Sequence, residues 1–335
     1  MDRRDTMNRY ARQIAVPEFG PESQARLKDA RVLVAGAGGL AAPLLPALVG
    51  AGVGHIRLVD PDVVDVSNLH RQTLFRTADV GLPKVNAAAD RLRGLNPDAI
   101  IEPIPAALDP SNAAALAEGT MLLIDCADSF SASYILSDLA MAAGLPLISA
   151  SVLGVSGYCG GFCATAPSLR AVFPDLPPRL GNCSEDGVVG TVVAVVGALQ
   201  AQMALGTITG ETPSPLGQLV TFDARGLRFG GFRFMGAPEP EFRPRFVAGS
   251  EISRDDWVVD LREAHEAPLA TPHALRLSVE AMSDAGSTPN TGQRAILCCR
   301  SGLRAWRAAE RLASRWTGEI LLAALGQTDS EGKAK

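Results

Sequence analysis

The sequence is poor in cysteine, in aromatic residues and in charge of one sign. Six cysteines are scattered among 335 residues, which excludes a small secreted fold held together by disulfide bonds. A formal net charge of −5 gives no basic excess, which argues against a nucleic-acid partner. The N-terminus, MDRRDTMNRYARQ, lacks the apolar core of a signal peptide. We therefore expect a reduced, cytoplasmic protein.

Two uncharged runs, residues 32–54 and 187–210, are long enough to cross a bilayer. Pro43, Pro46 and several glycines break the first run into a strand, a turn and a helix. The second run contains Gln200, and no cluster of lysine and arginine flanks either run as a topology signal would. We interpret the second run as a buried core helix and expect no membrane association.

Short apolar strands alternate with helical stretches from Arg31 onward. This alternation is typical of an α/β fold with a Rossmann-like, mostly parallel sheet and helices on both faces. The length suggests about two domains. Clustered prolines predict a linker at 236–250, which divides the chain into a large domain at 1–235 and a small α/β domain at 251–330.

A glycine-rich turn, GAGGLA, lies between the first strand and a helix. Gly36, Gly38 and Gly39 would let the backbone approach a phosphate, and the helix N-terminus adds free N–H groups and a positive dipole. Asp60 ends the next strand, about 20 residues on, where a carboxylate can accept hydrogen bonds from ribose hydroxyls. Alone, these residues fit a nicotinamide-dependent dehydrogenase as well as an enzyme that uses ATP.

Polar and charged residues downstream of the turn favour nucleotidyl transfer. They are Asn68, His70, Arg71, Gln72, Lys84, Asp125 and Asp128. A nicotinamide site does not need two more cations and a carboxylate beside the phosphates. Nucleotidyl transfer does, because negative charge builds up on the α-phosphate and on the leaving pyrophosphate, where arginine, lysine and Mg²⁺ stabilise it.

Seven segments together resemble the ThiF/MoeB/HesA family, whose members are similar to ubiquitin-activating enzymes. They are RYARQ, VLVAGAGGLA, GVGHIRLVDPDVVDVSNLHRQTLF, DVGLPKVNAA, LNPD, DCADSF and NCSEDGVVG, and the resemblance extends over about residues 8–235. The resemblance implies an enzyme that uses MgATP to adenylate the C-terminal glycine of a ubiquitin-like sulfur carrier. It also implies a homodimer.

The same resemblance assigns roles to individual residues. The implied nucleotide contacts are Gly36, Gly38, Gly39, Asp60, Asn68, Arg71, Gln72 and Lys84. Asp128 would hold Mg²⁺, and Arg12 would reach the phosphates of a neighbouring subunit. Arg71, Lys84 and Asp128 are the catalytic residues of adenylation. No protein base is expected, because a carboxylate is already nucleophilic.

The chain departs from the family where most relatives bind a structural zinc through two Cys-x-x-Cys pairs. The first pair is replaced by Ser168-Leu169-Arg170-Ala171 and the second by APEPEFRP. Cys159 and Cys163 have the wrong spacing for a zinc knuckle, and we interpret them as buried strand cysteines. We therefore expect no zinc.

Two other cysteines are candidates for sulfur chemistry. Cys183 precedes a predicted helix N-terminus, which lowers the pKa of a thiol. In relatives, a cysteine here can link covalently to the activated carrier or to transferred sulfur, although some relatives work without it. Cys299 ends a predicted strand in CRSGLR, where backbone N–H groups, a helix N-terminus, Arg300 and Arg304 would stabilise a thiolate or persulfide.

Residues 251–328 resemble a rhodanese domain, through CRSGLR and through Asp260, Arg262 and Glu263 in VVDLREAHE. The usual Gly-His-Ile-x-Gly-Ala segment is missing, so a purely structural domain is the alternative. Cys298, next to Cys299, is expected to point into the core.

The two halves suggest one route to a carrier thiocarboxylate. The partners would be a ThiS- or MoaD-like carrier ending in Gly-Gly and a persulfide donor such as a cysteine desulfurase. The overall likeness favours thiamine thiazole synthesis, with molybdopterin synthesis as the alternative. A dehydrogenase and a non-catalytic scaffold that binds carriers are the alternatives from other functional classes.

Overall fold

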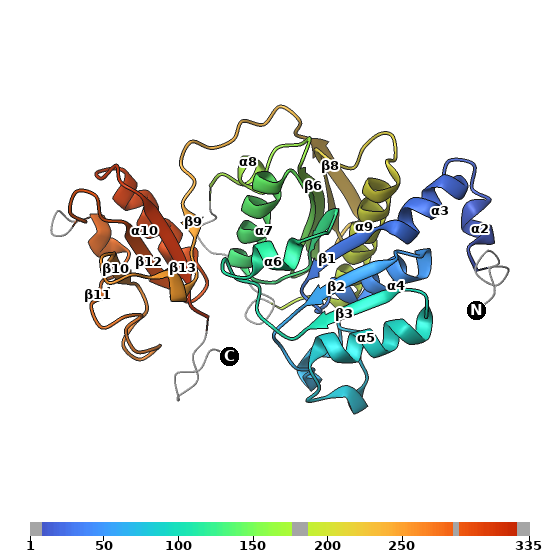
Figure 1. Ribbon diagram of the computed structural model, residues 1–335, viewed down its shortest axis with the longest axis horizontal. Coiled ribbons are helices and arrows are strands. Elements are labelled where there is room, and N and C mark those ends of the chain that lie inside the picture. Colours follow the sequence, from blue (N-terminus) through green and yellow to red (C-terminus); the bar gives the residue numbers. More distant parts are fainter. Residues whose placement is uncertain (1–8, 176–186, 284–287, 327–335) are drawn as a thin grey trace.

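Two sheets with their helices make up the computed structural model, which describes residues 9–175, 187–283 and 288–326 (Figure 1). The strands of the first sheet are β1 (Arg31–Ala35), β2 (His55–Val59), β3 (Ile100–Ile104), β4 (Leu122–Asp125), β5 (Pro146–Leu153), β6 (Ser156–Cys163), β7 (Gln218–Asp223) and β8 (Arg228–Arg233). The strands of the second are β9 (Arg245–Phe246), β10 (Trp257–Asp260), β11 (Leu275–Arg276), β12 (Ala295–Cys299) and β13 (Ile320–Ala324).

The described helices flank these sheets. The α-helices are α2 (Ala11–Ile14), α3 (Gly20–Asp29), α4 (Ala41–Ala51), α5 (Lys84–Leu95), α6 (Ala113–Ala117), α7 (Phe130–Ala143), α8 (Leu169–Val172), α9 (Gly190–Thr209) and α10 (Leu303–Ala313). Short 3-10 turns are η1 (Val66–Asn68), η2 (Thr77–Asp79), η3 (Gly249–Glu251) and η4 (Glu280–Ser283).

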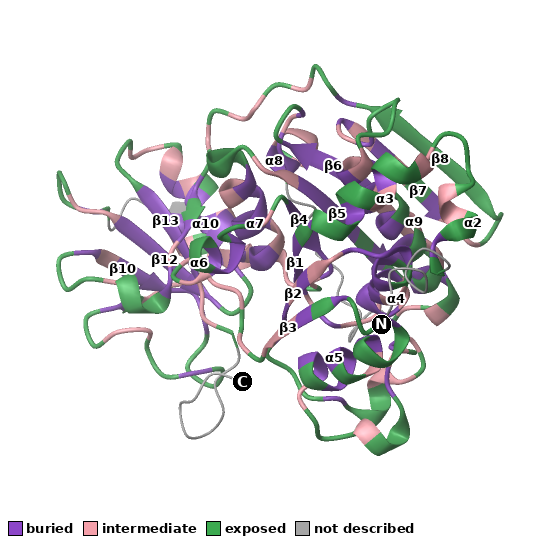
Figure 2. Cartoon of the chain, turned by 45° about the vertical axis from the view of Figure 1, so that its right-hand side comes forward, coloured by how far each residue is buried: buried purple, intermediate pink, exposed green. Residues whose placement is uncertain are grey.

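The first sheet has the order β3-β2-β1-β4-β5-β6-β7-β8. Its first five strands pair in parallel, and β6, β7 and β8 continue it antiparallel. Strand residues alternate between two cores: Val32 and Val34 pack with α4, α5 and α9, whereas Leu33 packs with α6 and α7. Buried residues are concentrated in the central strands of both sheets, whereas every residue of the edge strand β8 is exposed (Figure 2). The predicted α/β fold is confirmed.

The register of the central strands brings their carboxyl ends to one edge of the sheet. Ala35 at the end of β1 is paired with Val59 of β2 and with Asp125 of β4. The chain runs from β1 to β2 on one side, whereas β4 lies on the other side of β1, so the strand order reverses here. A crevice at such a reversal is where open α/β sheets bind ligands.

α9 is the one described helix that is long and apolar enough to cross a membrane by length and composition, and 56% of its apolar window is buried inside the protein. It packs close to the start of α4: a Cβ on Gly197 would lie 2.5 Å from the carbonyl oxygen of Leu40 and 2.5 Å from Pro43 Cγ. The predicted core helix is confirmed.

The second sheet is parallel, with the order β11-β10-β12-β13-β9. Its edge strand β9 lies within residues 236–250, the predicted linker, and pairs with β13. Phe246 of β9 is 7% exposed and joins the core. The sequence predicted neither β9 nor β13. The two residues of β9 are too few to show alternating polar and apolar side chains, and the wholly apolar ILLAA of β13 shows no such alternation either.

Candidate active site

The glycine turn after β1 contains two close approaches that exclude a side chain. Gly36 has φ of +98°, and a Cβ there would lie 2.5 Å from the carbonyl oxygen of Cys126. A Cβ on Gly39 would lie 2.8 Å from Val193 Cγ1. Glycine is therefore a steric requirement of this turn, and its backbone can approach a ligand at the N-terminus of α4.

Asp60 fixes the shape of the turn from the end of β2. Its carboxylate is 7% exposed; Oδ2 accepts the N–H of Ala37 at 2.7 Å and Oδ1 accepts the N–H of Asp62 at 2.8 Å. Burial raises the pKa of Asp60, against the opposing effect of the Lys84 charge and of the two N–H donors. Each oxygen can accept a second hydrogen bond, so Asp60 still has acceptor capacity for ribose hydroxyls. The ribose contact itself stays a prediction.

Lys84 begins α5 and turns its ammonium group toward the same end of β2. Nζ lies 2.7 Å from Asp62 Oδ2, and 6% of the Lys84 side chain is exposed against 60% for Asp62. A buried ammonium group needs an anionic or polar partner. Because Asp62 is largely exposed, a phosphate could replace its carboxylate as the partner of Lys84.

Arg71 lies over the glycine turn. Its side-chain Cγ would be 3.6 Å from a Cβ on Gly39. Its Nη2 donates to Asn68 Oδ1 at 2.9 Å, and its Nη1 lies 2.8 Å from His70 Nε2. Asn68 and His70 orient the guanidinium, and neither carries a carboxylate that would neutralise its charge.

Gln72 is the buried polar residue of this segment. It is 4% exposed, and its Nε2 would lie 3.7 Å from a Cβ on Gly38. Its Oε1 is buried and has no hydrogen-bond partner among the described residues. An unpaired buried acceptor costs about 1–3 kcal/mol, so a ligand donor beside the turn would remove this cost. This orphaned oxygen and the side-chain-free turn fit a nucleotide.

Two aspartates at the end of β4 have different environments. Asp125 is fully buried; it accepts the Ser149 hydroxyl at 2.7 Å and the Ala127 N–H at 3.1 Å, and its carbonyl accepts Gln200 Nε2 at 2.6 Å. Burial raises the pKa of Asp125 to about 6. Asp128 is exposed at the same edge of the sheet. Asp125 therefore holds the strand end, and Asp128 is free to meet a cation.

Arg12 does not lie at this site. It is exposed on α2, which packs against the far end of α4: Gln13 Nε2 donates to Ala51 O at 2.9 Å. Tyr10, beside it, accepts a hydrogen bond from Asn96 Nδ2 at 2.7 Å. At 1.5 Å per residue, α4 separates this end from the glycine turn by about 16 Å. The structure thus does not bring Arg12 to the phosphate site of its own chain.

Cys299 ends β12, and the loop that follows it holds the sulfur. The N–H of Gly302 lies 3.1 Å from Cys299 Sγ and the N–H of Ala305 lies 3.4 Å from it, so the predicted backbone donors are present. Both Cys299 and Cys298 are 0% exposed. Burial raises the pKa of the Cys298 thiol to about 12, as suits a core residue.

The charges around Cys299 differ from the expectation. Arg304 forms a two-point ion pair with Glu266 at 2.6 and 2.7 Å, so much of its charge is compensated. Arg300 is exposed. Asp260 and Arg262 pair with each other at 3.0 and 2.8 Å, almost fully buried. The Asp-x-Arg-Glu motif is thus used to hold the end of β10.

The remaining described cysteines, Cys126, Cys159 and Cys163, are buried: Cys126 Sγ lies 3.4 Å from Gln200 Oε1, and Cys163 Sγ lies 3.6 Å from Ser137 O. Burial raises the pKa of Cys159, whose sulfur lies 3.4 Å from Met203 Sδ. Burial also raises the pKa of Cys163 to about 12. Both are buried strand residues, as predicted. Cys183 lies outside the described residues.

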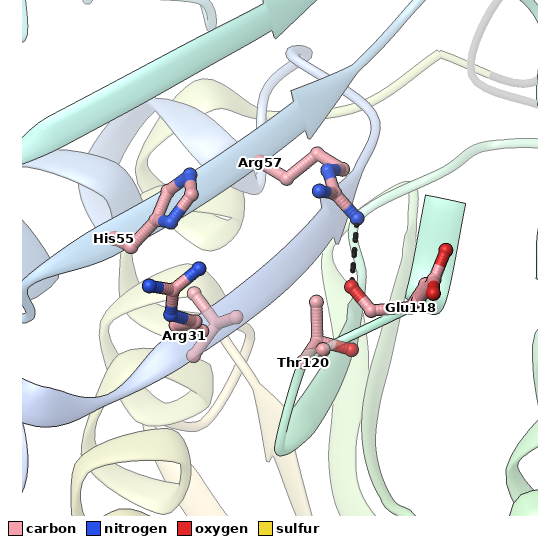
Figure 3. A pocket seen from close by; sticks show the side chains of 7 residues that line it. Arg31, His55, Arg57, Glu118 and Thr120 are labelled. Carbon is pink, nitrogen blue, oxygen red and sulfur yellow. Dashed lines mark hydrogen bonds between the residues drawn. The ribbon is translucent and has the colours of Figure 1, made fainter. Parts of the chain in front are cut away.

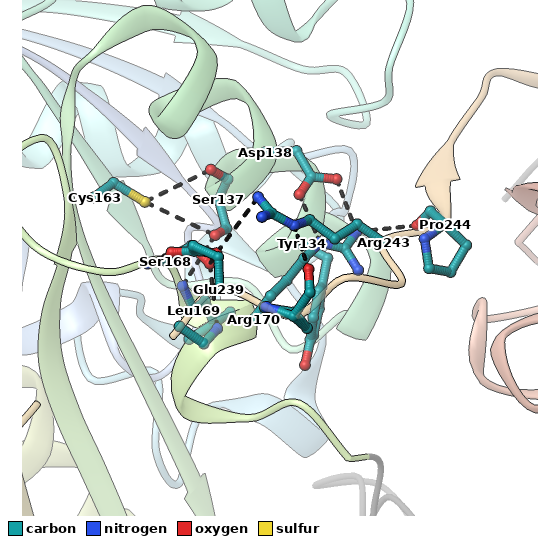
Figure 4. Close-up of polar contacts among 12 residues, drawn as sticks. Tyr134, Ser137, Asp138, Cys163, Ser168, Leu169, Arg170, Glu239, Arg243 and Pro244 are labelled. Carbon is teal, nitrogen blue, oxygen red and sulfur yellow. Dashed lines mark hydrogen bonds and ion pairs between the residues drawn. The ribbon is translucent and has the colours of Figure 1, made fainter. Parts of the chain in front are cut away.

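The two segments that stand in place of the Cys-x-x-Cys pairs contact each other through polar groups (Figure 4). Ser168 donates from its N–H and hydroxyl to the two oxygens of Glu239, at 2.7 and 2.6 Å. Arg170 Nη2 donates to Pro244 O at 3.2 Å. In the described part of the chain, no three His, Cys, Asp or Glu side chains are grouped to hold a metal.

Hollows elsewhere on the first sheet do not coincide with these residues. One of about 10 Å³ lies where β1 and β2 begin, beside Arg31, His55 and Arg57, at the opposite end of the strands from the glycine turn (Figure 3). Its volume suits about one water molecule. A wider one of about 340 Å³ lies at the turn between β5 and β6.

Sequence reasoning named Asp125 at the strand end but missed three residues that support the site. Asp62 pairs with Lys84, and Ser149 and Gln200 donate to Asp125. The signal for Gln200 was available, because an amide within a long apolar helix requires a buried partner. No local pattern indicated Ser149, which reaches Asp125 only through the pairing of β4 with β5.

Comparisons with known proteins give a consistent result. The model of the ThiF family matches residues 10–242. The chain is 40% identical over 229 residues to a protein of Thermus thermophilus named "Sulfur carrier protein adenylyltransferase", covering 66% of this chain and 84% of that protein. It is 40% identical over 282 residues to "Probable adenylyltransferase/sulfurtransferase MoeZ" of Mycobacterium tuberculosis, covering 82% of this chain and 71% of that one.

The similarity to MoeZ covers more of this chain than the ThiF match does, so it reaches into the second sheet. Among solved structures, MccB of E. coli has a TM-score of 0.62 at 21% identity, covering 70% of this chain and 73% of MccB. At that identity, the likeness shows the shared fold.

Gly36→Ala should lower the free energy of unfolding by about 2–4 kcal/mol, because the residue has a left-handed φ and the methyl group would collide with the Cys126 carbonyl. Gly50→Ala is the matched control: it lies in α4 with nothing within 4 Å of its Cβ, and should stabilise by about 0.5–1 kcal/mol. Urea unfolding of both variants measures the difference. Equal stabilities would show that the turn tolerates a side chain.

Purified protein should contain less than about 0.1 equivalents of zinc, because the segments in place of the Cys-x-x-Cys pairs offer no thiolates. Elemental analysis by mass spectrometry measures this. A relative that has both pairs, purified in the same way, is the positive control. About one tightly bound equivalent would contradict the prediction.

Proposed function

The chain belongs to the ThiF family, and on that premise we propose that it uses ATP to adenylate the C-terminal glycine of a ubiquitin-like sulfur carrier protein. One observation carries the proposal: Gly36 after β1, Asp60 after β2 and Asp128 after β4 meet at one edge of the sheet, with Arg71 over the turn. The names of the relatives from Thermus thermophilus and Mycobacterium tuberculosis support the reaction class.

In the proposed complex, the phosphates of ATP lie on the glycine turn and the N-terminus of α4. Arg71 and Lys84 compensate the negative charge that develops on the phosphate oxygens and on the leaving pyrophosphate. Asp60 accepts hydrogen bonds from the ribose. Asp128 is the exposed carboxylate that would hold Mg²⁺, which when bound adds positive charge beside the phosphates.

The carrier carboxylate attacks the α-phosphorus, the bond to the β-phosphate oxygen breaks, and pyrophosphate leaves. The product is a carrier acyl-adenylate, which has AMP as a leaving group where the free acid would have to expel oxide. No proton moves in this step, so the chain needs no general base. Its contribution is to position the reactants and to compensate charge.

We further propose that Cys299 supplies sulfur. A persulfide on Cys299, loaded by a donor such as a cysteine desulfurase, attacks the acyl carbon and displaces AMP. The product is an acyl disulfide between the carrier and Cys299. The N–H groups of Gly302 and Ala305, which donate to Sγ, favour an anionic sulfur in this loop. Cys299 is buried, so this half of the proposal requires the loop to open for loading.

The thiocarboxylate is then released by a second thiolate. We propose Cys183, on the basis of its sequence position before a helix. Its thiolate attacks Cys299 Sγ, the S–S bond breaks, and the electron pair leaves with the carrier thiocarboxylate. A Cys183–Cys299 disulfide remains, which a cellular dithiol must reduce. The need for free thiols suits a reducing, cytoplasmic compartment.

The position of Arg12 supports a homodimer. Arg12 lies exposed about 16 Å along α4 from the phosphate site of its own chain, so the proposed phosphate contact must be made in another subunit.

For the carrier, we propose a ThiS-like protein and a role in thiamine thiazole synthesis, with a MoaD-like carrier and molybdopterin as the alternative. Carrier-dependent ATP–pyrophosphate exchange, measured against a panel of carriers ending in Gly-Gly, tests both. The carrier with the highest kcat/KM identifies the pathway. No exchange with any carrier would contradict the proposed function.

Arg71→Ala and Asp128→Ala should each reduce carrier-dependent ATP–pyrophosphate exchange by about 100-fold or more, because each removes charge compensation at the phosphates. Asp90→Ala and Arg93→Ala are matched controls, since this exposed ion pair on α5 makes no contact with the turn. They should keep the exchange rate within about twofold. Exchange close to that of the wild type in both site variants would remove this site from the proposal.

Cys299→Ser should retain exchange and lose thiocarboxylate formation by about 100-fold or more, because serine carries no persulfide. Mass spectrometry of the carrier after incubation with ATP and a persulfide donor measures the product. Cys298→Ala controls for the loss of a neighbouring buried thiol and should retain sulfur transfer. If Cys299→Ser transfers sulfur normally, the second domain is only architectural.

A further inference from the structure

A buried arginine joins the two sheets outside the nucleotide site. Arg170 of α8 is 1% exposed. Its Nε and Nη2 donate to the two carboxylate oxygens of Asp138 at 2.7 and 2.8 Å, and Nη2 also donates to Pro244 O at 3.2 Å (Figure 4). Asp138 lies on α7, and Pro244 immediately precedes β9. One side chain therefore connects a helix of the first sheet with the segment that enters the second.

Aromatic rings from both domains pack against the same side of this guanidinium. Arg170 Cζ lies 4.8 Å from the ring centroid of Tyr134 on α7 and 4.8 Å from that of Trp306 on α10. The two rings are 5.3 Å apart. Arg170 Nη1 is buried without a hydrogen-bond partner among the described groups. The cation–π contacts with these two rings are the interaction left to stabilise that end of the cation.

This contact lies between the residues of adenylation and those of sulfur transfer. Phe130 begins α7, two residues after Asp128, and its ring centroid is 5.9 Å from that of Trp306. A Cβ on Gly302 would lie 3.4 Å from Phe130 Cδ1, and the Gly302 N–H is the donor to Cys299 Sγ. The Cys299 loop thus rests on the start of α7, close in the chain to Asp128.

We propose that Arg170 is a positioning residue for sulfur transfer, whose guanidinium, paired with Asp138 and in contact with the rings of Tyr134 and Trp306, holds the Cys299 loop against the start of α7. The consequence for sulfur transfer rests on the proposed function. A domain that moves freely on a linker reaches a target at a local concentration of about millimolar. A domain held in one orientation keeps its reacting loop near the target for a larger fraction of the time.

Arginine is specifically suited to this place. Its planar guanidinium binds a carboxylate through two hydrogen bonds while its faces stack on aromatic rings, and a lysine ammonium does neither in the same geometry. Arg170→Met therefore removes the contact, and Arg170→Lys retains only the charge. Trp306→Leu removes the ring of the second domain and leaves the Arg170–Asp138 pair intact, so it provides an independent variant if Arg170→Met does not fold.

The first test measures the rate at which iodoacetamide alkylates each cysteine, by peptide mass spectrometry of the full chain. In Arg170→Met and Trp306→Leu, Cys299 should react at least about fivefold faster than in the wild type, because the loop is released by local opening. Cys159 and Cys163, in the core of the first sheet, should stay protected. Arg170→Lys should fall between Arg170→Met and the wild type.

Arg243→Met is the matched control. Arg243 directly precedes Pro244. Its side chain is 46% exposed, and its Nη1 lies 3.7 Å from Glu239 Oε2. Replacing it should leave the alkylation rate of Cys299 unchanged. The proposal is overturned if Cys299 reacts no faster in Arg170→Met and Trp306→Leu, or if Cys159 and Cys163 become reactive in parallel. The latter outcome would make Arg170 a residue of general stability.

The second test separates the positioning role from the proposed function. Thiocarboxylate formation in Arg170→Met and Trp306→Leu should have a kcat about tenfold lower, while carrier-dependent exchange and sulfur transfer from thiosulfate to cyanide stay within about twofold. An unchanged kcat overturns the positioning role. A wild-type protein without exchange overturns the proposed function instead, and the alkylation rates then still decide whether Arg170 holds the loop.

Discussion

The shared register of β1, β2 and β4 is the constraint on which the rest of the site depends. Ala35 is paired with Val59 on one side and with Asp125 on the other, so the residues that follow these three strands emerge at the same edge. The close approach of Gly36 to the Cys126 carbonyl is a direct result of this alignment. A shift of one residue in either pairing would separate the glycine turn from Asp60 and Asp128 and turn their side chains to the wrong face.

Buried polar groups maintain this alignment. Asp60 accepts from the backbone of the glycine turn, and Asp125 is held by Ser149 and by the backbone N–H of Ala127. These carboxylates are desolvated, and their hydrogen bonds compensate part of that cost. Of the groups to which the proposed reaction assigns ligand contacts, Arg71 and Asp128 are accessible. Asp60 and Lys84 are buried, so they also hold the end of β2.

The second sheet contains one feature that the local sequence pattern predicted and one that it did not. The sequence predicted that Cys299 ends a strand and faces the backbone N–H groups of a loop and a helix, and this is confirmed. The sequence also predicted that Arg304 adds positive charge beside Cys299; in the structure Glu266 lies against Arg304 and compensates much of that charge. Glu266 is 38 residues away in the chain. Local spacing contains no information about such a pair, which forms only when two separate loops meet.

The sequence by itself determined the α/β class, the glycine turn, the position of Asp60 at a strand end and the cysteine loop. These features depend on residues close together in the chain, and the physics of turns, strand alternation and helix N-termini acts over the same short range. Only the tertiary structure decided the partners of Lys84, the contact between Ser168 and Glu239 and the place of Arg170 against two aromatic rings. These depend on strand order and domain contact, which bring distant segments together and bury charges that a local pattern assigns to the surface.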